Sequence, residues 1–404
     1  MKWRRWLLVG VLAAILLPLA LALNRSAATG ANPPPTSADV RTARRIFERV
    51  VFARQASKPR RIRFTWAELA TGAAMSGRAA GEDRVSLVSE TTRAHLQISH
   101  GLPWGFWLNV HAFVAPDKNG APHIHARVGH LPLPAFVVHG AIALTAQLLR
   151  MRGVDVLPLR QMVKLLQLDA RGMSAVLNLP ANSRALRALA GVDDEIDPVR
   201  IEAHYCRLAS VKRTGPVQLA GLVNQAFAAS DATVSENRAI FIALALVVAQ
   251  IDAGALPEGK SKLFKRCGKP PAEFQLQGRA DLAKHWTVSA AITAYLGTDA
   301  SLTLGTWKEI SDSGAGGSGF SLVDLAADRS GVFSAERGTD ELQARSLQNW
   351  LAQATEDSLL PVGALALAEG MTEGEFRARY TDTDSDTYAE ALARIDSALQ
   401  VLMH

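Results

Sequence analysis

The chain has 404 residues, of which 48% are hydrophobic and 20% charged, and its formal net charge is +6 at pH 7. This composition excludes wholesale disorder, which needs low hydrophobicity and a high net charge, and the length predicts about two or three domains. The basic excess is small for the length and does not indicate nucleic-acid binding. Two cysteines are too few for a disulfide-rich scaffold.

The first segment predicts targeting to a membrane. A basic start at residues 2–5 precedes an uncharged apolar run over residues 6–23. As a helix this run would be about 27 Å long, just enough for a hydrocarbon core of about 30 Å. It is either a signal peptide cleaved at the small residues Ala20 and Ala22 or an uncleaved anchor, and its length favours the anchor. We therefore expect a single-pass inner-membrane protein with a cytoplasmic N-terminus and a periplasmic body.

Three further segments are expected after this run. Residues 24–37 are polar and contain several Pro and Gly residues, which is typical of a linker. Residues 38–212 predict a strand-rich α+β domain, because the hydrophobic period changes from 3.6 to two within it. Residues 213–404 predict an all-α domain, and an acidic, turn-forming stretch at residues 191–198 precedes it.

The α+β domain is expected to hold an antiparallel sheet covered by helices. Alternation predicts strands, and helical spacing predicts helices around them. The expected strands are residues 93–99, 106–114, 123–129 and 172–179. The expected helices are residues 38–52, a helix capped by Thr65, one ending near residue 151, and one over residues 157–168.

The register of the central hairpin follows from its two faces. Opposing Val114 with Ile124 places apolar residues on one face, and a two-residue turn would mix the faces, so a longer loop is expected. The same register puts His111, His123 and His125 together on the polar face. Imidazole is a common transition-metal ligand, but no known ligand spacing is present, so a solvated sheet face is favoured.

The order of anchor, helix and sheet resembles the YpmS-like family of anchored envelope proteins. The Gly-His-Leu-Pro-Leu-Pro step at residues 129–134 carries this resemblance. It implies a membrane-tethered sheet covered by helices. Such a concave sheet could hold a lipid, and an ordinary packed core is the alternative.

The all-α domain is expected to contain consecutive helices. They cover residues 217–228, 235–251, 281–296, 301–311, 321–330, 339–354 and 388–402. A basic loop at residues 259–269 is short and does not alternate basic with aromatic residues, so it is expected to be solvated or to touch anionic lipid headgroups. Export would permit a disulfide between Cys206 and Cys267, worth about 4 kcal/mol in the loop-entropy model; two buried thiols are the alternative.

Polar residues recur at helical spacing between residues 279 and 331. Pairs four residues apart lie on one side of a helix, so three consecutive helices can aim them at one seam. The candidate site residues are His285, Lys308, Glu309, Asp312, Asp324 and Asp328.

This stretch also resembles a known group. A histidine, a K-E-x-x-D step and F-S-x-x-D-L-x-x-D-x-x-G resemble the YfiM-like lipoproteins and, more distantly, the VanZ-like membrane proteins. The first resemblance implies placement in the cell envelope without a particular reaction. VanZ-like proteins have several spans, and one is predicted here, so their role does not carry over.

Two functions remain open from the sequence. The first is a membrane-anchored envelope protein that binds a lipid, a cell-wall component or a protein partner. The second is a metal-assisted hydrolase of an envelope substrate. In it His285 is the general base with Lys308 and Glu309 beside it. A hard cation such as Mg²⁺ or Ca²⁺ would be bound by Asp312, Asp324 and Asp328. For the same residues, a buried structural network of paired charges is the alternative.

Overall fold

The computed structural model describes most of the chain in two compact units. The described residues are 16–54, 58–79, 81, 84–90, 92–151, 157–179, 197–210, 215–228, 230–251, 266–270 and 273–402. The first unit comprises residues 1–35 and 39–181, and the second comprises residues 36–38 and 182–404. An antiparallel sheet in the first unit and helices in the second confirm the predicted α+β class.

The predicted membrane span falls mainly outside the described residues. Its last part, residues 16–22, is helical. Among the described helices, none combines the length and apolar character that a bilayer crossing requires.

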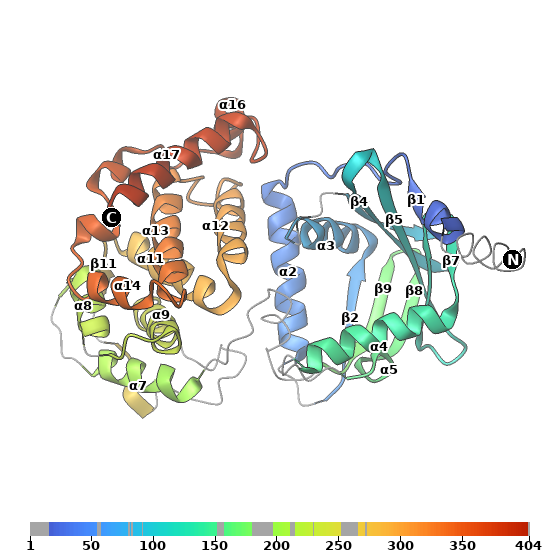
Figure 1. The fold of residues 1–404 in the computed structure, drawn as a ribbon, viewed down its shortest axis with the longest axis horizontal. Helices are drawn as coiled ribbons and strands as arrows, with labels where there is room; N and C mark the ends of the chain where they lie inside the picture. The colour runs from blue at the N-terminus through green and yellow to red at the C-terminus, as the bar shows by residue number, and fades with distance from the viewer. Residues whose placement is uncertain are drawn as a thin grey trace, which may run out of the picture. The chain divides into compact units, whose positions relative to one another are not determined.

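The first unit is built on an antiparallel sheet, sheet A (Figure 1). Its strands in order are β3 (Val85–Glu90), β4 (Arg93–Gly101), β5 (Trp107–Pro116), β6 (Pro122–Val128) and β7 (Leu131–Leu133). Val114 pairs with Ile124 across β5 and β6, which confirms the predicted register. The connecting loop is longer than two residues, as expected, and its Asp117 Oδ1 accepts the N–H groups of Asn119 and Ala121.

A smaller sheet, sheet B, packs against α2 (Ser37–Arg54). It joins β2 (Arg60–Thr65), β9 (Gly172–Leu177) and β8 (Val163–Asp169). Ile62 and Phe64 of β2 form a small core with Ala53 of α2. The second predicted helix is α3 (Trp66–Ala79), where the Thr65 hydroxyl accepts the Glu68 N–H.

The helix expected over residues 157–168 was wrong. A single turn, α5 (Leu159–Met162), gives way to β8, which pairs with β9 along its length. The sequence V-K-L-L-Q-L-D forms a strand here because pairing with β9 satisfies its backbone N–H and C=O groups. Leu166 is buried, on the same face of sheet B as Ile62.

Part of the expected linker is held on sheet A. β1 (Leu23–Asn24) pairs with the start of β5. Further along, the Ala28 N–H donates to Ser99 Oγ and to Asn109 Oδ1, both at 3.0 Å. Because Ser99 and Asn109 are buried, this segment is an integral part of the first unit.

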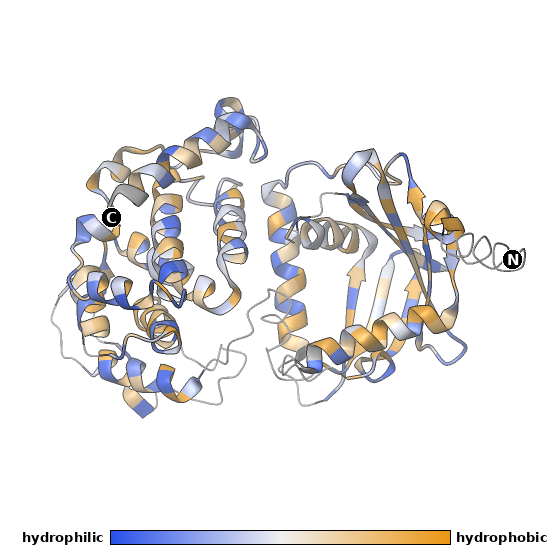
Figure 2. Ribbon diagram, in the orientation of Figure 1, coloured by the Kyte–Doolittle hydropathy of each residue, from blue (hydrophilic) through white to orange (hydrophobic). Residues whose placement is uncertain are grey.

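The helix α4 (Ala135–Met151) follows β7 and is apolar around most of its circumference. Figure 2 shows hydrophobic residues along most of its length. Val138 is buried, whereas Phe136, Leu144 and Leu148 are exposed. A helix that is hydrophobic all round is normally buried in protein or lipid. The described residues do not cover α4 in this way, because most of its apolar side chains are exposed.

The second unit is a bundle of helices with a dense core. Its helices are α7 (Pro198–Ala209), α8 (Leu219–Ala228), α9 (Val234–Val248), α11 (Ala280–Leu296), α12 (Thr298–Asp312), α13 (Leu322–Gly338), α14 (Ala344–Leu351), α15 (Glu356–Leu359), α16 (Glu373–Tyr380) and α17 (Asp386–Leu402). A short parallel pair, β10 (Val217–Gln218) and β11 (Phe274–Gln275), departs from the all-α expectation. The helix α7 precedes the expected boundary at residue 212, yet it packs against α9 of this unit.

The helices α11 and α13 pack closely at Gly331. A Cβ on this residue would lie 2.1 Å from the Trp286 carbonyl oxygen, so the close approach of the two helices requires glycine here.

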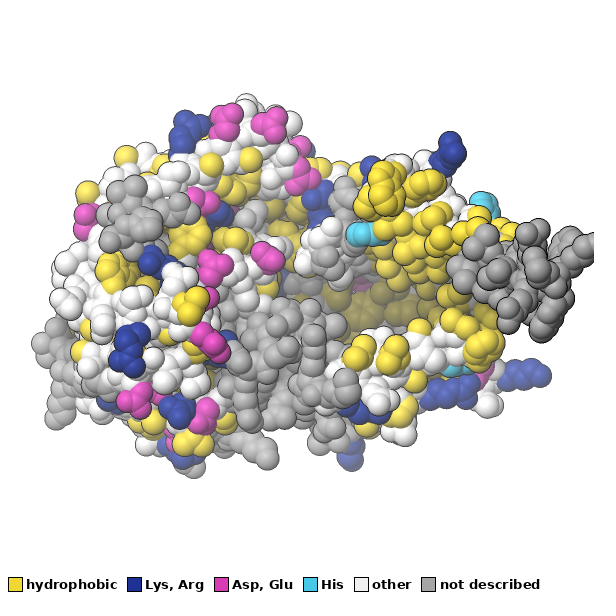
Figure 3. Space-filling model, in the orientation of Figure 1, with side chains coloured by type: hydrophobic (Ala, Val, Ile, Leu, Met, Phe, Trp, Pro, Cys, Tyr) yellow, Lys and Arg dark blue, Asp and Glu magenta, His cyan; other side chains and the backbone are white. Residues whose placement is uncertain are grey.

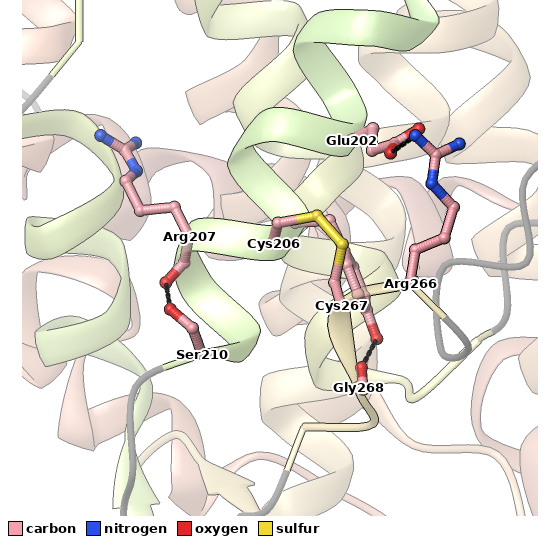
Figure 4. The surroundings of a disulfide bond; sticks show 8 residues. Glu202, Cys206, Arg207, Ser210, Arg266, Cys267 and Gly268 are labelled. Carbon is pink, nitrogen blue, oxygen red and sulfur yellow. Dashed lines mark hydrogen bonds and ion pairs between the residues drawn. A yellow bond between two sulfur atoms is a disulfide. The ribbon is translucent and has the colours of Figure 1, made fainter.

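A disulfide joins Cys206 of α7 to Cys267 (Figure 4). Their Cα atoms are 5.0 Å apart, a separation typical of a disulfide. Beside it, the Tyr205 hydroxyl donates to the Gly268 carbonyl at 3.0 Å. The bond therefore fixes the segment after Cys267 on the end of α7.

Replacing both cysteines by serine is expected to destabilise the second unit by about 2–4 kcal/mol, because the unfolded chain loses a long closed loop. Denaturant unfolding with and without dithiothreitol measures the effect. Reductant should lower the stability of the wild type and leave the double variant unchanged. Equal stability of the oxidised and reduced wild type would contradict the prediction.

Candidate functional site

The six candidate residues meet in the second unit. They lie on α11, α12 and α13, which are consecutive helices packed on one another. Ser321 begins α13 by accepting the Asp324 N–H with its hydroxyl, which fixes the first turn of the helix. The helical spacing of the sequence thus becomes one cluster of charges.

His285 lies between two carboxylates. Its Nδ1 is 3.0 Å from Asp328 Oδ1, and its Nε2 is 3.3 Å from Asp324 Oδ2. The Ser289 hydroxyl also donates to Asp328 Oδ1, at 2.6 Å. Both ring nitrogens are therefore in contact with an acidic oxygen, and His285 links α11 to two turns of α13.

Lys308 bridges the acids of α12. Its Nζ lies 2.9 Å from Glu309 Oε1 and 3.0 Å from Asp312 Oδ2. Glu309 is fully buried, and its second oxygen accepts the Ser321 N–H at 3.0 Å. Lys308 and Asp312 are partly exposed, so the cluster reaches the surface through these two residues.

The charges of the cluster shift one another's pKa values. Burial alone would lower the pKa of His285, but its hydrogen bonds to Asp324 and Asp328 raise that pKa to about 10. Burial raises the pKa of Glu309 to about 7, against the opposing effect of Lys308. Burial works against the charge of Asp324 too, yet the hydrogen bond from His285 keeps its pKa below the ordinary value. At neutral pH His285 is consequently an imidazolium, with both nitrogens donating.

Two polar neighbours of His285 on α11 have other partners. Asp281 shares the helical stripe of His285, but it pairs with Arg279 at 2.6 Å. The Ser289 hydroxyl donates to Asp328 Oδ1 and not to the His285 ring. Gly305 of α12 was not identified from the sequence; a Cβ there would lie 3.0 Å from Asp328 Oδ2, so its small size makes room for that carboxylate.

The best-placed metal ligands differ from the predicted set. One atom each of His285, Glu309 and Asp328 lies within 4.8 Å of the other two. Because the charged His285 ring has no free lone pair, the carboxylates of Glu309 and Asp328 are the ligands that this group offers. From the sequence we had predicted Asp312, Asp324 and Asp328 as the metal ligands. Asp328 Oδ2 accepts no hydrogen bond from the described residues, so one buried oxygen is free to bind a cation.

A second buried charge cluster was missed in the sequence. His204 Nε2 lies 2.9 Å from Glu236 Oε1, and Arg200 donates to the other Glu236 oxygen at 2.7 Å. Burial lowers the pKa of His204. These residues join α7 to α9. The i, i+4 spacing of Arg200 and His204 was the available signal, but their partner Glu236 lies 36 and 32 residues further along the chain.

The histidine-bearing face of sheet A is less solvated than expected. His95 and His111 are buried, with His95 Nε2 3.1 Å from His111 Nδ1. The His95 ring stacks on Phe113. His125, in contrast, is exposed. The stacking of these rings, which the alternation of residues cannot predict, excludes water from the part of the face around His95 and His111.

Comparison with known proteins gives no match: no family model, no curated protein and no solved structure resembles the chain. The resemblances noted in the sequence therefore stay predictions.

The charge state of His285 predicts a pH dependence of stability. A folded-state pKa raised to about 10 stabilises the unit fully below the unfolded pKa of about 6.5, and this stabilisation is lost as the pH rises through 10. The wild type should lose on the order of 3 kcal/mol in free energy of unfolding between about pH 7 and pH 10. In His285→Gln this loss should be much smaller.

Thermal unfolding at several pH values measures the slope. His125→Gln, which replaces the exposed histidine of sheet A, is the matched control and should keep the wild-type slope. A His285→Gln slope equal to that of the wild type would show that His285 is uncharged in the fold.

Proposed function

We propose that this protein is a membrane-tethered envelope protein that binds an acyl chain of a lipid in its first unit. The observation that carries the proposal is the apolar inner face of sheet A. Ala94 and Val85 at one edge of this face are buried. Eight further apolar side chains on it are partly exposed: Leu96, Ile98, Val110, Ala112, Val114, Ile124, Ala126 and Val128. Figure 3 shows hydrophobic side chains gathered in a hollow above α4 in this view.

The second unit shows what a closed core looks like in the same chain. There Phe227, Ile240 and Phe241 are completely buried. The inner face of sheet A is as apolar but remains accessible. Soluble monomeric proteins rarely leave contiguous apolar patches above a few hundred Å² open to water, which supports an apolar occupant.

The charge of the first unit supports a lipid as that occupant. Residues 24–181, which follow the apolar run, have 20 Lys and Arg against 9 Asp and Glu, a net charge of +11. Residues 182–404 have 21 against 29, a net charge of −8. A unit with a basic net charge and an accessible apolar face, here called the groove, complements a lipid with an anionic headgroup and an acyl chain. The basic start and apolar run at residues 2–23 support the tether.

Filling the groove should weaken lipid binding. Ala112 lies on the inner face opposite Ala126, and Ala112→Phe would take the volume of about four methylene groups. At about 0.8 kcal/mol per methylene, the loss is about 3 kcal/mol, or about 100-fold in Kd. Displacement of a fluorescent fatty acid from the purified protein measures the Kd.

The matched control is Ala115→Phe, on the same strand but on the outer face, opposite His123. It should bind like the wild type. If Ala112→Phe and Ala115→Phe bind equally well, the inner face of sheet A is not the lipid site.

A metal-assisted hydrolase is the second candidate, and the unpaired Asp328 Oδ2 beside His285 and Glu309 favours it. Carboxylate oxygens of Glu309 and Asp328 would hold the hard cation. Because His285 donates from both nitrogens, it would act as a general acid and not as the base that the sequence suggested. Its burial between two carboxylates gives more support to a structural network.

Asp328→Asn separates these two roles. In a structural network the variant leaves His285 with one charged partner fewer, and the unit should lose about 3–5 kcal/mol of stability. In a metal site the fold should survive, while Mn²⁺ binding, followed by electron paramagnetic resonance, should disappear. Asp396→Asn, which removes the partner of Arg329 away from His285, controls for the loss of an ordinary ion pair. A stable Asp328→Asn protein that binds Mn²⁺ like the wild type would contradict both roles.

A further inference from the structure

Several features of the first unit meet at one end of sheet A. The first residue of β5, Trp107, pairs with Asn24 of β1 on one side and with Gly101 of β4 on the other. β6 ends at Val128 beside the start of β5, and β7 leads from there into α4. The turn η1 (Pro103–Gly105) lies between β4 and β5. β1, η1 and the beginning of α4 therefore share this end.

Large apolar side chains are exposed at this end. Trp104 of η1 is 93% exposed, Phe136 of α4 is 76% exposed, and Leu17 is 62% exposed. The backbone of Trp104 also has a φ of 63°, a left-handed conformation that costs about 1–2 kcal/mol in a residue other than Gly. The chain thus presents an indole to its surroundings although neither burial nor backbone conformation favours it there.

The exposed apolar surface continues along α4. Leu144 is 59% exposed and Leu148 is 48% exposed. The sequence around α4 carries no acidic residue between Asp117 and Asp155. An apolar surface without negative charge suits an interface with anionic lipids, where Trp and Phe side chains enter the headgroup layer.

We propose that α4 and the Trp104 turn dock the first unit onto the surface of an anionic phospholipid bilayer. The occupant is a bilayer because the apolar run of residues 6–23 leads directly into β1 at this end, without a spacer. The His130 N–H donates to the Leu21 carbonyl at 2.7 Å and holds the end of that run on the sheet. The net charge of +11 over residues 24–181, which follow the run, attracts the unit to anionic lipid.

Docking would place the apolar groove at the membrane, where a lipid could pass between the bilayer and sheet A without crossing water. This inference rests on the first unit's proposed place at a membrane, but not on whether the groove holds a lipid.

The test uses the full-length protein with an environment-sensitive fluorophore, nitrobenzoxadiazole, on Phe136→Cys or on Leu144→Cys. The native cysteines are joined in a disulfide, so the introduced thiol takes the label. The protein is mixed with vesicles of phosphatidylglycerol and phosphatidylcholine carrying bromine near the top of the acyl chains. We expect brominated lipid to quench both labels by about twofold or more, since interfacial helices lie about 5–10 Å into the headgroup and acyl boundary.

The matched control is Leu342→Cys, whose parent side chain is 94% exposed in the second unit; its label should not be quenched. Vesicles of phosphatidylcholine alone should quench the α4 labels less, because the attraction to the basic unit is removed. Labels on α4 that are quenched no more than the Leu342→Cys label would overturn the docking.

Two further measurements keep this result separate from the proposed function. Resistance to alkaline extraction from the vesicles reports the tether, whether or not the α4 labels are quenched. Ala112→Phe introduced beside Phe136→Cys should keep the quenching while it removes lipid from the groove. Loss of quenching in that double variant would show that the α4 labels report the groove and would also overturn the docking.

Discussion

The alternation of apolar and polar residues along β4, β5 and β6 is the constraint on which the first unit depends. It sends Val110, Ala112 and Val114 to the inner face and their odd-numbered neighbours to the outer face. On the outer face, His95, His111 and Phe113 pack ring on ring. The inner face receives no comparable cover and remains accessible. The accessible apolar face on which the proposed lipid site rests follows from this difference between the two faces.

The second unit buries charged side chains, whereas the first unit leaves apolar side chains accessible. The second unit buries charges and pairs them, as His285 does with Asp324 and Asp328. Burying a charge is tolerable when a partner of opposite sign and further hydrogen bonds accompany it. The first unit instead keeps apolar side chains accessible, which is unfavourable in water and favourable against lipid. The opposite net charges of the two halves of the sequence fit this division.

The disulfide and the N-terminal segment support the same proposed location. A Cys206–Cys267 bond persists in an oxidising compartment, and an apolar run behind a basic start favours export. The segment after the run is bound to Ser99 and Asn109 of sheet A. A unit fixed so close to the run would stay near the bilayer surface.

The sequence by itself determined the parts that depend on short-range periodicity. The register of β5 and β6 followed from opposing apolar residues, since a shift by one residue would exchange the faces. The meeting of His285, Lys308 and Asp324 followed from helical spacing on consecutive helices with short connections. Tertiary structure alone decided the rest. β8 became a strand because β9 was available to pair with it, and the partner of His204 lies on another helix. The cover of the apolar face of sheet A and the charge of His285 both depend on side chains from distant parts of the sequence. A local sequence pattern contains no information about such contacts.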